Sequence, residues 1–194
     1  MLRLAPITWI NVFPDYGFEN GFGVWSTVNF GGYSGEVVER DFAYEGSHVL
    51  KLDIDSASGG TQCGPSYNVY SGYSWFSNRL WKVRTAFRHD SSRSLGTAWL
   101  NVMLIANTGV HGTLGPRVLD VNARISEVAV DTWKVGEWTG QFPANAAGYM
   151  LFPNLRISAK TVNGPIVYLD DVRLFVEELV DFPKEKTGFM IQIR

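Results

Sequence analysis

Hydrophobic and polar residues alternate along several short segments of this chain, and this pattern predicts β-strands with one buried face. Segment 80–88 shows it most clearly. The alternation places Trp81, Val83, Thr85 and Phe87 toward a core and points Lys82, Arg84, Ala86 and Arg88 outward. Further strands are expected at 36–40, 48–55, 98–105, 118–130, 133–142, 149–159 and 166–175. No segment of ten or more residues has a helical period.

Turn-forming clusters separate these strands, at Gly31-Gly32, Gly59-Gly60, 90–96, 107–109 and 163–165. Many short strands joined by glycine-rich turns predict an all-β fold, a two-sheet antiparallel β-sandwich (jelly roll). We expect one such domain over residues 11–176, with an N-terminal arm at 1–10 and a C-terminal arm at 177–194.

The N-terminal arm is apolar, and the C-terminal one, after a charged stretch, alternates like a strand over Phe189-Met-Ile-Gln-Ile193. Two interpretations are open. The arms dock on their own sandwich, or an extended arm adds a strand to the exposed sheet edge of a neighbouring chain.

Composition excludes several classes of partner. The chain has 194 residues, a net charge of −2 and 14% aromatic residues. Such a charge gives no electrostatic reason to bind nucleic acid or an anionic membrane, and no apolar run is long enough to span a bilayer. A single cysteine, Cys63, rules out an intrachain disulfide. The first ten residues do not form a secretory signal, so the chain starts inside a cell or has lost a signal, and we favour the first.

Three carboxylates stand in unusual places. Asp170 and Asp171 interrupt an apolar β-type run near one end, and Glu19 lies in a glycine-rich turn near the other. Carboxylates within strands are costly unless they are paired, hydrogen-bonded or bound to a cation, and hard oxygen ligands suit Ca²⁺. The alternative is that the two aspartates end the last strand and face water.

Five motifs together resemble the β-jelly-roll carbohydrate-binding modules that accompany xylanases and glucanases, within the galactose-binding-like group. They occur in the family's order over about residues 11–176, at Gly17-Phe18-Glu19 with Trp25, Tyr44–Leu52, Trp81–Arg88, Asp131–Trp133 and Tyr168–Leu174. The resemblance implies a jelly roll with a structural Ca²⁺ held by Glu19, a carbonyl near Gly17, the region of His48, and Asp170. It also places Trp25 and Trp133 in the core.

The resemblance says less about the ligand, because Ala86 stands where the family often carries an aromatic platform. Other aromatic residues crowd segment 66–76, which we expect to be a surface loop. Together with outward residues of two strands it gives the expected recognition residues, namely Tyr70, Tyr73, Trp75, Phe76, Arg84, Arg88 and Trp99. The alternative is that some of these rings fold back and cover an end of the sandwich.

Nothing in the chain matches a catalytic motif. The strand carboxylates Glu36, Glu39, Glu127 and Glu137 fit no known glycosidase pattern, and the three histidines lack metal or triad spacing. We therefore expect a non-catalytic binding or structural protein. The favoured setting is a virion surface, where a capsid or tail decoration component meets protein partners in an assembly and glycans as well. A glycan-binding module of a polysaccharide-degrading system is the alternative, and a jelly-roll glycosidase ranks third.

Overall fold

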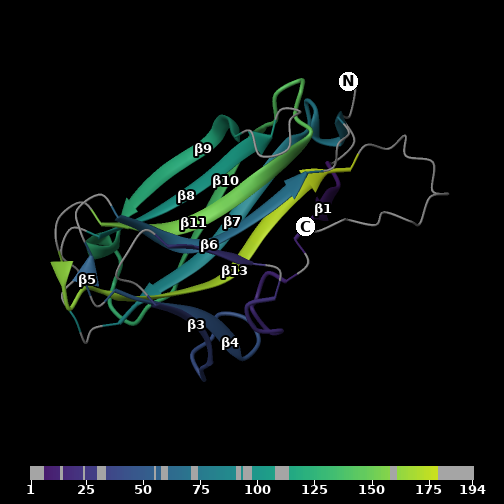
Figure 1. The fold of residues 1–194 in the computed structure, drawn as a ribbon. Coiled ribbons are helices and arrows are strands. Elements are labelled where there is room, and N and C mark those ends of the chain that lie inside the picture. Colours follow the sequence, from purple (N-terminus) through teal and green to yellow (C-terminus); the bar gives the residue numbers. More distant parts are fainter. Residues whose placement is uncertain are drawn as a thin grey trace.

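A computed structural model shows two antiparallel β-sheets packed face to face (Figure 1). It describes residues 7–13, 15–23, 25–29, 34–54, 56–57, 61–70, 74–90, 93, 98–107, 114–157 and 161–178. Within this part of the chain, helical structure is limited to the 3₁₀ turns η1 (Ser74–Phe76) and η2 (Ile125–Glu127). No helix among these residues is long and apolar enough to cross a membrane. The prediction of an all-β sandwich is confirmed.

Sheet A has the strand order β10-β7-β13-β4-β3, with β1 paired to the far end of β13. Its strands are β1 (Trp9–Asn11), β3 (Ser34–Glu39), β4 (His48–Asp53), β7 (Leu80–His89), β10 (Lys134–Gln141) and β13 (Ile166–Glu177). The last strand is therefore central to the sheet, and all its pairings are antiparallel.

Sheet B has the order β2-β6-β11-β8-β9. Its strands are β2 (Ser26–Asn29), β6 (Thr61–Tyr70), β8 (Ala98–Asn107), β9 (Leu114–Arg124) and β11 (Gly148–Ile157). Four of them, β9, β8, β11 and β6, run side by side in Figure 1. The short strands β5 (Ser56–Ala57) and β12 (Thr161–Val162) form a separate pair.

The core fills the space between the sheets. Strand β7 contributes Trp81, Val83 and Phe87, as its alternation predicted, and β8 contributes alternate residues from Ala98 to Ala106. Phe13, Trp25 and Tyr67 form an aromatic cluster within this core, with ring centroids 4.5 to 6.2 Å apart. Such rings bury large apolar areas and dominate the stabilisation of a core this size.

Part of the expected N-terminal arm belongs to the sandwich itself. Trp9 and Ile10 lie in β1, where they pair with Glu177 and Val176 of β13. The proposed boundary at residue 10 is therefore wrong for these two residues, because they complete the chain's own sheet. Residues 1–6 and 179–194, with the remainder of both expected arms, lie outside the described residues.

Candidate functional site

The two ends of the chain meet at the acidic positions singled out above. Glu19 lies in the turn that follows β1, and Asp170 lies in the middle of β13. A methyl group placed on Gly17 would be 3.8 Å from Asp170 Oδ1 and 4.0 Å from Glu19 Oε1, so Gly17 stands between the two carboxylates. The structure thus brings together Gly17, Glu19 and Asp170, as the family resemblance implied.

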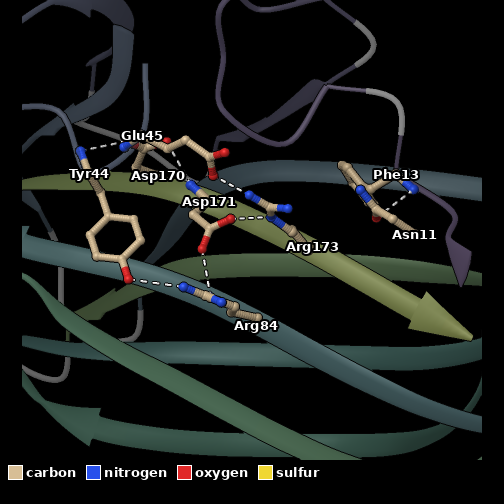
Figure 2. Close-up of polar contacts among 8 residues, drawn as sticks. All are labelled: Asn11, Phe13, Tyr44, Glu45, Arg84, Asp170, Asp171 and Arg173. Carbon is tan, nitrogen blue, oxygen red and sulfur yellow. Dashed lines mark hydrogen bonds and ion pairs between the residues drawn. The ribbon is translucent and has the colours of Figure 1, made fainter. Parts of the chain in front are cut away.

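Both carboxylates are held by backbone N–H groups of the segment that precedes β4. Tyr44 N and Glu45 N donate to Asp170 Oδ2 at 2.9 and 3.0 Å (Figure 2). Ser47 N and His48 N donate to Glu19 Oε1, each at 2.9 Å. The turn that carries Glu19 and the last strand are therefore connected through residues 44–48, which the two acids hold in place.

His48 reaches this site through its ring as well as its backbone. Its Nδ1 lies 3.1 Å from Glu19 Oε2, and hydrogen bonds from His48 and Ser47 lower the pKa of Glu19 below its usual value even though burial works to raise it. The ring nitrogen therefore holds the glutamate in place.

Asp170 and Asp171 are both completely buried, so the interpretation that they face water is wrong. Burial raises the pKa of Asp170 to about 6, although hydrogen bonds from Glu45, Asp171 and Tyr44 oppose the shift. Asp171 has φ = 49° at a β-bulge and lies against two arginines, with Arg84 Nε 2.7 Å from its Oδ2 and Arg173 Nε bonded to its Oδ1 (Figure 2). Burial nevertheless raises the pKa of Asp171, so the arginines only partly offset its desolvation.

The carboxylate oxygens of Glu19 and Asp170 near Gly17 are hard ligands of the kind that Ca²⁺ prefers. Asp170 Oδ1 accepts one hydrogen bond, from Asp171 N, and so keeps a lone pair. Among the described residues no group of three or more His, Cys, Asp or Glu side chains is placed to hold a metal. A cation bound by Glu19 and Asp170 would therefore take its other ligands from backbone carbonyls, which Ca²⁺ accepts.

Asp15 is an acid in this region that the sequence analysis missed. It is buried, the charge of Glu19 adds to burial in raising its pKa, and its Oδ2 has no hydrogen-bond donor among the described residues. In the sequence, only its position four residues before Glu19 in the same turn could have indicated Asp15. Acidic residues are too common in turns for this position to be informative.

The expected recognition residues do not form one surface. Segment 66–76 is not a loop throughout, since 66–70 belong to β6 and 74–76 form η1. Phe76 is 4% exposed and packs against Phe142 and Tyr149, so its assignment to a binding surface is wrong. Trp75 is half-buried between Phe76 and the guanidinium of Arg79. The side chain of Tyr70 and the whole of Tyr73 lie outside the described residues.

Arg84 and Arg88 point outward from sheet A, as predicted, whereas Trp99 points outward from sheet B. They therefore lie on opposite sides of the sandwich, and a single face carrying all three is wrong. Alternation shows whether a residue faces the core, but not which sheet its strand joins.

On sheet A the outer face around Ala86 is covered. Ala86 has no exposed surface, and its cross-strand neighbour Asp170 holds the loop at Tyr44. Arg84 donates to the Tyr44 hydroxyl at 2.9 Å (Figure 2). Trp133 is half-buried beside Tyr44, outside the core to which it was assigned, and donates from its indole N–H to the Phe42 carbonyl at 2.6 Å. An aromatic side chain at position 86 would have no access to a sugar.

On sheet B the outer face is built in rows that cross the strands. One row runs Arg156-Trp99-Arg124, and the next runs Asn154-Asn101-Asn122. The outward position predicted for Trp99 is confirmed. Trp99 is half-buried, and the Arg124 guanidinium carbon lies 4.7 Å from its ring centroid.

A buried amide network supports these rows. Asn154 Nδ2 donates to Asn101 Oδ1 at 2.9 Å, and Asn101 Nδ2 lies within 3.2 Å of both Asp120 Oδ1 and Asn122 Oδ1. Asn101 and Asn154 are at most 1% exposed, whereas Asp120 and Asn122 are exposed. The network thus fixes two exposed polar groups, and Asn122 lies in the row next to the indole. Proteins use an indole with a nearby polar group to stack on polar rings and to form hydrogen bonds with them.

No family model matches this chain, and no curated protein matches it. Solved structures do. TmCBM61, solved in complex with β-1,4-galactotriose, has a TM-score of 0.61 at 16% identity, over 87% of this chain and 99% of that one. The CBM22-1 xylan-binding domain of Xyn10C from Paenibacillus barcinonensis has a TM-score of 0.53 at 15% identity, over 92% and 99%. The enzymatically active domain of tailspike protein 4 from bacteriophage CBA120 has a TM-score of 0.55 at 11% identity, over 86% of this chain and 21% of that one. The chain therefore has the β-jelly-roll fold of carbohydrate-binding modules.

Proposed function

We propose that this chain is a non-catalytic carbohydrate-binding domain that holds a glycan on the outer face of sheet B. The observation that carries the proposal is the row Arg156-Trp99-Arg124 with exposed Asn122 in the row next to it. An indole offers a flat apolar surface to a sugar ring, and the neighbouring amide and guanidinium groups offer hydrogen bonds to hydroxyls. Carbohydrate-binding modules with the same fold support this choice.

The carboxylates weighed as catalytic groups are dispersed over different elements. Glu36 and Glu39 lie on β3, Glu127 lies in η2, and Glu137 lies on β10 opposite Arg84. Glu36 accepts a hydrogen bond from Lys51 at 2.9 Å. Retaining glycosidases instead need two carboxyl groups about 5–5.5 Å apart across a substrate. This dispersal favours binding over catalysis.

We also propose a structural Ca²⁺ at Glu19 and Asp170, supported by the convergence of both carboxylates on Gly17. When bound, the cation would supply positive charge to a buried acid. The virion surface, the assembly partners and the use of the arms stay predictions. Part of a phage tailspike domain shares this fold, and so does a xylan-binding domain, so the fold fits both settings.

The binding proposal is tested by replacing the indole. Trp99→Ala should weaken binding to soluble polysaccharides at least about fivefold in affinity electrophoresis, because removing a central aromatic anchor typically costs more than about 1 kcal/mol. The matched control is Trp9→Ala, which removes a half-buried indole on sheet A. The panel comprises β-1,4-galactan, xylan and polygalacturonate. If the folded protein binds none of them, or if both variants lose binding equally, the proposed site is wrong.

A further inference from the structure

Two exposed arginines flank the indole of Trp99, one on each neighbouring strand. Arg124 of β9 and Arg156 of β11 are each the cross-strand partner of Trp99. Adjacent strands lie about 4.8 Å apart, so the two arginine backbones are about 10 Å apart across the ring. The cation–π contact of Arg124 keeps its guanidinium next to the indole, so charge and stacking surface are presented together.

These two guanidinium groups have no carboxylate partner among the described residues, in contrast to those on sheet A. There, Arg84 pairs with Asp171, Arg88 with Asp131, and Arg173 with both Asp171 and Glu45. No ion pair within the described part of the chain includes Arg124 or Arg156. Around Trp99, the outer face of sheet B thus presents guanidinium donors that no acid of the described residues neutralises.

The carboxylate of Asp120, on the same face, already accepts hydrogen bonds from within the protein. Asp120 accepts from Arg117 at 2.7 Å and from Asn101 at 2.8 Å. Burial works to raise the pKa of Asp120, but these hydrogen bonds and the charges of Arg117 and Arg156 lower it. Strands β8, β9 and β11 thus place three arginines, Arg117, Arg124 and Arg156, with the single carboxylate of Asp120 among the described residues of this face. This part of the face has a local excess of positive charge although the chain as a whole carries −2.

We propose that the glycan recognised on sheet B is anionic and carries carboxylates, as a polymer of uronic acids does. This inference rests on the proposed function and names its ligand class. A guanidinium matches a carboxylate in shape and can donate two parallel hydrogen bonds to it. With the pyranose ring on Trp99, carboxylates on that sugar or its neighbours reach Arg124 and Arg156. A neutral polysaccharide would leave both donors without an acceptor.

The test compares each acidic polymer with its own neutral form. Polygalacturonate and alginate are measured by calorimetry beside the same polymers after reduction of their carboxyl groups to alcohols, which changes the charge and keeps the glycosidic linkage. We expect at least one acidic form to bind about tenfold or more tightly than its reduced form. This difference in affinity should shrink as salt rises from about 50 to about 500 mM, because the Debye length becomes severalfold shorter. Arg124→Gln and Arg156→Gln should each remove most of this preference. Arg40→Gln is the matched control on a loop far along the chain from both strands.

The outcomes separate the two proposals. If xylan, galactan or a reduced polymer binds as well as the acidic forms and loses binding in Trp99→Ala, the site is right and the anionic ligand is wrong. If Arg40→Gln weakens acidic binding as much as Arg124→Gln does, the attraction is general and the inference is overturned. If neither acidic nor neutral polymers bind the folded protein, the carbohydrate-binding function fails as well.

Discussion

Without calcium, this protein should become less stable as pH rises from 4 to 7, because Asp170 must ionise inside the fold. Its pKa is about 6 in the folded protein against an ordinary value of 3.8. Over that interval the folded protein holds a proton that the unfolded chain has released, so the free energy of unfolding falls as pH rises. The pKa of Asp170 thus differs by about two between the folded and unfolded states. This difference corresponds to about 3 kcal/mol in the free energy of unfolding, at about 1.36 kcal/mol for a pKa change of one.

The assay is urea denaturation of calcium-free protein at pH 4.5, 6.0 and 7.5. Other acids also shift, upward at Asp15 and Asp171 and downward at Glu36, so the quantity to compare is the difference between wild type and Asp170→Asn. This difference should change by about 2 kcal/mol, because roughly a third of the whole effect is already complete at pH 4.5.

Calcium should remove the penalty. A cation at Glu19 and Asp170 stabilises the ionised carboxylate, so at pH 7.5 calcium at a hundred times its dissociation constant should raise the free energy of unfolding by about 2.7 kcal/mol. It should do little at pH 4.5 or in Asp170→Asn. Asp131→Asn, which removes an exposed acid in the turn before β10, serves as the control. A wild type whose stability relative to Asp170→Asn stays constant or rises with pH would refute the reasoning.

Three further predictions concern single positions. Phe76→Ala should lower the free energy of unfolding by about 3–5 kcal/mol in urea, because it empties a core site; a loss below 1 kcal/mol would show that the ring is at the surface. Gly46→Ala should be destabilising and should abolish the thermal shift caused by calcium, because φ is +69° there and the added methyl group would lie 2.2 Å from Glu19 Oε1; an unchanged calcium response would contradict the role of Glu19. Ala86→Trp should create no sugar binding in affinity electrophoresis and should cost about 1–3 kcal/mol by overpacking a site with no exposed surface; a folded variant that gains binding would show that this face is open.

Strand alternation was sufficient to predict most of this fold. All eight strands expected from it correspond to observed strands, and the inward and outward residues of segment 80–88 are as predicted. The prediction succeeded because a half-buried strand leaves a period of two in its own sequence. Strand β6 was missed because Gly64 and Pro65 interrupt its pattern and its aromatic residues drew attention as surface groups.

The candidate sites were harder to predict, for a reason that lies in topology. Local sequence placed Arg84 and Trp99 on outward faces, but only the strand order shows that these faces are on opposite sides of the sandwich. The meeting of Glu19 with Asp170 was expected from a family resemblance, since residues 151 positions apart have no local signal of contact. The backbone amides that hold both acids leave no trace in the side-chain sequence.

The place of β13 in sheet A also constrains the order of folding. It lies between β7 and β4 and pairs with β1 as well, so the first described strand and the last are joined directly. During synthesis, sheet A cannot close until residue 177 has left the ribosome, and until then β4 and β7 present unpaired edges and apolar faces. Pairings so distant in sequence also make folding slow, because the chain loses much entropy before the contacts form. Variants that slow the docking of β13 should therefore reduce the yield of soluble protein more than their effect on the folded state would suggest.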